Sequence, residues 1–75
     1  MNWPAWYEIR IAETLDKHWQ QWFLDLELAF VPDPGLGTLL RGCLRDPAAL
    51  FGALARLRDL NLTLLEVRQV HEAER

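Results

Sequence analysis

The stretch DPAALFGALARLRDLN, residues 46–61, restricts the possible folds of this chain more than any other part of it. Asp46 is a favourable N-cap, Pro47 suits the first helical position, and Asn61 is a residue type that commonly closes a helix in a left-handed conformation. Between these ends, apolar residues recur at helical spacing, at positions 50, 53, 54, 57 and 60. The sequence therefore predicts an amphipathic helix with one face built to lie on a flat apolar layer.

Four other segments alternate between apolar and polar residues, a pattern typical of half-buried strands. The predicted strands are residues 6–12, 26–31, 38–44 and 63–70. Residues 1–5 form a short lead-in, the segment PDPGLG (residues 32–37) predicts a hairpin loop, and residues 71–75 are a polar tail that we expect to fray.

A second helix is predicted to start at Thr14 or Asp16 and to end at about Leu24. Its apolar stripe consists of Leu15, Trp19, Trp22, Phe23 and Leu26. Because these residues recur at helical spacing, we expect both tryptophans of the stripe to lie in the core.

The predicted order is βαββαβ, and right-handed crossovers then give a four-stranded antiparallel sheet of order 4-1-3-2 with both helices on one face. This α+β architecture is the ferredoxin-like plait, and it predicts that Ile9, Leu40 and Leu65 face the helices. Gly42 would then sit beneath a helix, where a missing side chain permits close approach. Six charged strand residues would share the opposite face: Glu8, Arg10, Glu27, Arg41, Glu66 and Arg68.

Seventy-five residues make one domain, residues 1–75, and so short a chain buries only about 60% of its unfolded surface. One cysteine excludes an intrachain disulfide, and no Cys/His cluster predicts a structural zinc. Self-association is the remaining way for such a scaffold to enlarge its core. We therefore expect a homo-oligomer, specifically a dimer.

The net charge of −3, with Lys and Arg dispersed among the acidic residues, argues against nucleic acid as a partner. No apolar run approaches the ~20 residues of a membrane span, and the first residues lack the pattern of a signal peptide. The expected localisation is cytoplasmic.

No catalytic, cofactor-binding or metal site is predicted. His18 and His71 each lack a second ligand at metal spacing, and Cys43 has no resolving cysteine. Glu8 and Glu66 should lie on neighbouring strands, where Arg10 and Arg68 could form cross-strand ion pairs with them.

The run LLRGCLRDPAALFGALARLRDLNLTLLEVRQV, together with HWQQWF, resembles a group of short uncharacterised bacterial proteins over about residues 7–70. The chain departs from their pattern at Pro47, Phe51, Asn61 and Thr63, so any role that a histidine plays at position 51 would be absent here. The resemblance implies no activity. At the level of topology alone, the predicted fold is also similar to ACT regulatory domains.

Aromatic, apolar and ion-paired residues outside the predicted core form a candidate interface. They are Trp3, Trp6, Leu39, Arg41, Phe51, Leu64, Glu66 and Arg68. We therefore expect a small non-enzymatic module that self-associates. The alternative is an ACT-like regulatory module that binds a small metabolite near the end of the first strand, at Ala12, Glu13 and Thr14, although these residues lack a glycine that would permit close approach.

Overall fold

The computed structural model of the chain describes residues 3–31 and 37–71. Seven elements lie within these residues, where η denotes a 3-10 helix: β1 (Ala5–Ile11), η1 (Lys17–Trp22), η2 (Leu24–Leu26), β2 (Ala29–Val31), β3 (Thr38–Leu44), α1 (Pro47–Asp59) and β4 (Leu64–Val70).

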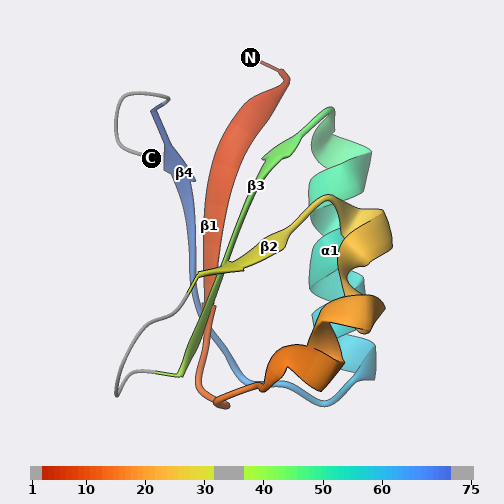
Figure 1. Cartoon of the computed structure of the whole chain (residues 1–75). Coiled ribbons are helices and arrows are strands. Elements are labelled where there is room, and N and C mark those ends of the chain that lie inside the picture. Colours follow the sequence, from red (N-terminus) through yellow and green to blue (C-terminus); the bar gives the residue numbers. More distant parts are fainter. Residues whose placement is uncertain (1–2, 32–36, 72–75) are drawn as a thin grey trace.

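The four strands form one antiparallel sheet in the order β2-β3-β1-β4. Read from the β4 edge, this is the predicted order. The helix α1 and the two 3-10 helices lie on the same face of the sheet (Figure 1). The α+β class and the antiparallel sheet are therefore confirmed, with one face covered and one open.

The helix α1 has the predicted ends. The Asp46 side chain accepts a hydrogen bond from the Ala49 N–H at 2.8 Å, and Pro47 is the first helical residue. At the other end Leu60 is the C-cap, and Asn61 follows with a φ of 61°. Both boundaries are local features of the sequence, which is why they could be predicted.

The first connection between strands is not an α-helix, so the prediction of a helix from Thr14 or Asp16 to Leu24 is wrong. In an α-helix the Leu26 N–H would donate to the Trp22 carbonyl, but it donates to the Phe23 carbonyl at 3.0 Å. The Trp22 oxygen accepts instead from Nη1 of Arg56 in α1, at 2.6 Å. A tertiary contact thus occupies the Trp22 carbonyl at the end of a segment whose aromatic residues have only modest helix propensity.

This change also moves Trp22 out of the core. Trp22 is 49% exposed, whereas Phe23 is fully buried and Leu15 and Trp19 pack against the core from its margin. The predicted burial of Trp22 is therefore wrong, and the residues four apart, Leu15, Trp19 and Phe23, supply the contact with the sheet.

The core lies between the sheet and the helical layer. It consists of Ile9, Ile11, Phe23, Leu28, Leu40, Leu44, Leu50, Ala53 and Leu57. A Cβ on Gly42 would lie 2.2 Å from the carbonyl oxygen of Glu27, so only glycine fits there. The predicted close approach at Gly42 is confirmed, but the neighbour is the connection between η2 and β2 and not a helix.

The strand β2 is shorter than predicted, because Glu27 has a φ of 60° and ends the extended conformation before Ala29. Glu27 therefore lies outside the sheet, with its carboxylate 3.9 Å from Arg45. The prediction that Glu27 shares the charged sheet face is wrong. Residues 1–2 of the lead-in, 32–36 of the hairpin loop and 72–75 of the tail lie outside the described residues.

The strand β4 contains an irregularity that the sequence pattern did not show. Ile9 and Leu40 are fully buried against the helical layer, as predicted, but Leu65 is 55% exposed. The pairing of β1 with β4 shifts between Arg10 and Ile11, which lie opposite Glu66 and Leu64. Leu65 is the extra residue of this β-bulge, and the prediction that the helices cover its side chain is wrong.

Candidate interaction surface

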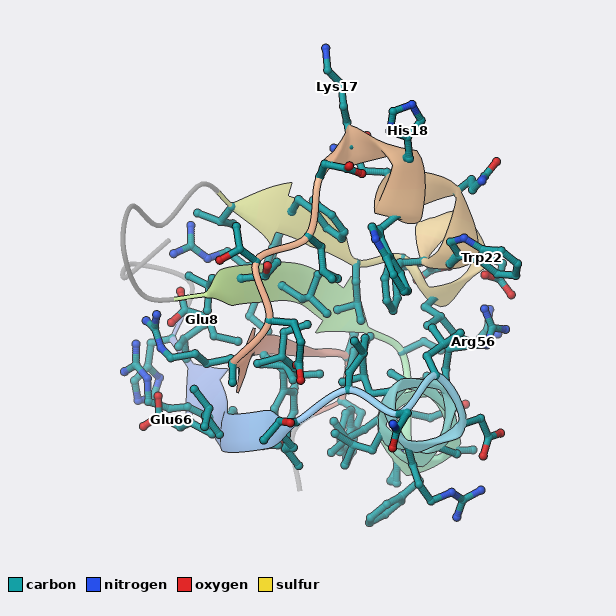
Figure 2. All side chains as sticks on the ribbon, turned by 90° about the horizontal axis from the view of Figure 1, so that it is seen from below. Glu8, Lys17, His18, Trp22, Arg56 and Glu66 are labelled. Atoms are coloured by element: carbon teal, nitrogen blue, oxygen red, sulfur yellow. The ribbon has the colours of Figure 1, made fainter. Side chains whose placement is uncertain are left out.

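Three charged side chains join the strands β3, β1 and β4 on the sheet face that points away from α1. Glu8 lies opposite Arg41 on one side and Arg68 on the other. Arg41 donates to Oε2 of Glu8 through Nε at 2.8 Å and also through Nη2, and Arg68 donates to Oε1 through Nη2 at 2.8 Å. Figure 2 shows Glu8 and Glu66 on this face. The predicted Glu8–Arg68 cross-strand pair is confirmed, and Arg41 completes it.

The carboxylate of Glu8 is held in its charged form. Only 9% of the residue is exposed, and this burial by itself would raise the pKa. The hydrogen bonds and positive charges of Arg41 and Arg68 together outweigh it, so the pKa of Glu8 lies below its ordinary value. Both oxygens of this ionised carboxylate accept hydrogen bonds from guanidinium groups. Such a group is suited to holding neighbouring strands together and poorly suited to transferring protons.

The other strand charges continue this face toward the β4 edge. Arg10 lies opposite Glu66 in the ladder, and both alternate with Ile9 and Val67. Five of the six predicted charges, all except Glu27, therefore share the face.

The N-terminal residues of the predicted interface are mostly used inside the domain. Trp3 stacks on Tyr7 with ring centroids 5.7 Å apart, and its indole N–H is buried without a hydrogen-bond acceptor among the described residues. Trp6 is half-buried, and Leu39 is buried. These residues do not form an exposed apolar patch with the rest of the predicted set.

Apart from Trp22, the exposed large apolar side chains of the described residues belong to β4 and α1. Six of the seven β4 residues are exposed. We call the apolar side chains of this region the β4 flank: Phe51 (65% exposed), Leu64 (46%), Leu65 (55%) and Val67 (36%).

Helix geometry places Phe51 toward β4. Arg56 reaches across to Asp25 of η2, with Nη2 3.0 Å from Oδ2, so this side of α1 faces the 3-10 helices. Figure 2 shows Arg56 beside Trp22 on that side. Phe51 precedes Arg56 by five residues, about 140° around the helix, and therefore lies on the other side.

Leu65 and Val67 are exposed apolar residues that the predicted interface did not include. Alternation placed Leu65 against the helices, but β4 is an edge strand. The available signal was the predicted order of strands itself, which places the apolar sequence LLEVRQV at an edge of the sheet.

The end of β1 holds a separate polar cluster. The carboxylate of Glu13 accepts hydrogen bonds from the Thr63 N–H and hydroxyl, each at 2.8 Å. The hydrogen bond from the Thr63 N–H is the main cause of the lowered pKa of Glu13. The Thr38 hydroxyl donates to the Glu13 carbonyl at 2.8 Å and accepts from the Leu15 N–H at 2.9 Å. These groups bond one another and close the end of the sheet.

The remaining candidates stay isolated. His18 is exposed, with Nδ1 3.3 Å from the carboxylate of Asp16. His71 follows the end of β4, and half-buried Cys43 lies on β3. Within residues 3–31 and 37–71, no group of three or more His, Cys, Asp or Glu side chains could hold a metal ion. In the same part of the chain, no helix is long and apolar enough to span a membrane.

Comparison with curated proteins found no match, and comparison with solved structures found none either. A family model described as a domain of unknown function, DUF8691, matches residues 6–68. Because the match covers most of the chain, the protein belongs to this family of domains of unknown function.

Proposed function

We propose that this chain is a small non-enzymatic module that self-associates as a dimer through the β4 flank. The observation that carries the proposal is that a strand rich in leucine and valine is exposed at six of its seven residues. Exposed apolar side chains that cluster on one surface are typical of a protein–protein interface.

The fold gives a physical reason for this exposure. We propose that it is a ferredoxin-like plait in which the first crossover helix is reduced to η1 and η2. A single full helix then leaves Leu64, Leu65 and Val67 exposed at the edge. A second copy can supply the missing cover, and each Å² of apolar surface that it buries contributes about 25 cal/mol.

The metabolite-binding alternative has weaker support. Its site would lie near Glu13, where the carboxylate and the Thr63 and Thr38 hydroxyls are already occupied by internal hydrogen bonds. A ligand would have to displace these bonds, whereas burial of the β4 flank requires no such exchange.

Light scattering coupled to size-exclusion chromatography tests the proposal. We expect the natural chain to elute with twice the chain mass at high micromolar concentration and Leu65→Glu to elute as a monomer. Trp22→Glu is the matched control, because it places the same charge at a similarly exposed apolar side chain (49% against 55%) on the other flank. It should remain a dimer, and circular dichroism should show that both variants are folded. A natural chain that stays monomeric at high micromolar concentration would refute the proposal.

A further inference from the structure

We infer that two copies join their β4 strands edge to edge, antiparallel, with the two-fold axis passing through Val67, so that the sheet continues across eight strands. This inference rests on the proposed self-association and specifies its geometry. It places a second copy of the chain, and no other partner, against the β4 edge.

The edge is suited to strand addition. The sheet ends at β2 on one side and at β4 on the other, and β2 has three residues whereas β4 has seven. Natural edge strands are commonly protected by proline, lysine, short length, other charges or β-bulges. The strand Leu64–Val70 has no proline or lysine and is not short, and its bulge and its two charges leave the backbone around Val67 extended. Among the described residues, no strand pairs with the outer side of β4.

Backbone alternation directs the outer hydrogen-bonding groups to Val67. The Ala12 N–H donates to the Thr63 carbonyl at 2.9 Å. The backbone N–H and carbonyl groups of alternate residues of β1, Arg10 and Glu8, therefore also point toward β4. Their opposite residues, Glu66 and Arg68, face back toward β1. Val67 lies between them, and its N–H and carbonyl therefore point outward, where the same groups of a second copy can exchange two hydrogen bonds.

Charge selects this register over its neighbours. A two-fold axis through Val67 places Glu66 of each copy opposite Arg68 of the other, and both pairs lie on the charged sheet face. The next outward residues are Leu65 and Gln69. An axis at Leu65 would place Glu66 opposite Leu64, and an axis at Gln69 would place Arg68 opposite Val70, so neither register pairs the opposite charges. An axis midway between two residues would place neighbouring residues of the strand opposite each other. Their side chains lie on opposite faces of the sheet, whereas residues that pair across an antiparallel ladder share one face. Arg68 bonds Glu8 through Nη2 and its side chain is still 50% exposed, so it can take part in a second pair.

The same register brings apolar side chains together on the helical side. Val67 of one copy lies directly beside Val67 of the other, and Leu65 lies opposite Gln69. The β4 flanks of the two copies then meet between the two α1 helices, which covers side chains that a single copy leaves exposed. A two-fold axis at Val67 therefore pairs opposite charges on one face of the sheet and brings apolar side chains together on the other.

Disulfide trapping tests the register. In a Cys43→Ser background, Val67→Cys should form a covalent dimer under mild oxidation, because hydrogen-bonded antiparallel residues have Cα atoms about 5.5 Å apart, within disulfide range. Leu65→Cys is the matched control, because its two copies would be separated by about 13 Å along the strands and should not cross-link. Both variants should fold, since both positions are exposed.

A charge reversal tests the pairing. Glu66→Arg should raise the dimer dissociation constant by about tenfold, since two attractive pairs become repulsive. Asp59→Arg makes the same change in net charge on the exposed side of α1 and should leave the constant unchanged.

The outcomes separate the two proposals. A chain that is dimeric by light scattering but cross-links at Leu65→Cys, or at neither position, would overturn the Val67 register and leave self-association standing. A natural chain that is monomeric and does not cross-link as Val67→Cys would overturn both.

Discussion

Replacing Glu8 by glutamine should destabilise the domain more than any other isosteric change on the open sheet face. Glu8 ties three strands together and is 9% exposed, and the substitution removes its charge while keeping its shape. Hydrogen bonds to charged groups contribute about 1.5–3 kcal/mol, and loss of one member of a buried ion pair costs more because the remaining charge is left without compensation.

The arginines reduce this cost, because Arg41 and Arg68 have side chains 27% and 50% exposed and can turn to water. Glutamine can also still accept one hydrogen bond. We therefore expect a loss of about 2 kcal/mol in the free energy of unfolding, which corresponds to a fall of about 8–16 °C in Tm for a domain of this size.

The pH dependence gives an independent check. The pKa of Glu8 in the folded state lies below its ordinary value of 4.5, so the stabilisation is present above pH 4.5 and is lost as the pH falls through the lowered pKa. The difference between the natural chain and Glu8→Gln should therefore shrink in acid. Thermal and urea unfolding by circular dichroism, at one fixed protein concentration, would measure both effects.

Glu27→Gln is the control for this experiment, because Glu27 is an exposed glutamate outside the sheet and outside the proposed interface. Its free energy of unfolding should change by no more than about 0.5 kcal/mol. A Glu8→Gln variant as stable as Glu27→Gln at neutral pH would refute the structural role assigned to the Glu8 cluster.

Two further predictions concern the packing of the helical layer. Gly42→Ala should destabilise the fold by about 1–3 kcal/mol, because its Cβ would collide with the Glu27 carbonyl, whereas Gly52→Ala meets nothing within 4 Å and should stabilise α1 by about 0.5–1 kcal/mol in denaturant titrations. Arg56→Met should increase amide exchange at Leu26 several-fold relative to Arg58→Met, since Arg56 holds the Trp22 carbonyl, and equal exchange in both variants would contradict the explanation given for the tight turns.

The parts of the fold that could be predicted from the sequence depend on residues within one segment or on the general handedness of connections between strands. Asp46, Pro47 and Asn61 specify the ends of α1 within the segment itself. The strand order follows from the alternation of elements and the right-handed crossover rule. The Glu8–Arg68 pair follows in turn, because neighbouring strands bring alternate residues together.

The parts that could not be predicted depend on contacts between distant segments. The helical spacing of Leu15, Trp19 and Phe23 is real, but it does not distinguish an α-helix from consecutive 3-10 turns. The Trp22 carbonyl also bonds Arg56, which lies more than thirty residues away along the chain. The bulge at Leu65 is a property of the β1–β4 register and leaves no mark in the alternation of β4 itself. The predicted interface included Phe51 and Leu64, which are both exposed, but it left out Val67 and also Leu65, which was expected to lie beneath two full helices.

Amide hydrogen exchange at Val67, followed as the protein concentration is raised from low to high micromolar, tests most directly whether a second copy covers the β4 edge. The outward N–H of Val67 should exchange slowly only where the dimer is populated, while that of Ile9 in the buried strand β1 stays equally protected throughout. A Val67 amide that exchanges at one rapid rate at every concentration would contradict edge-to-edge self-association.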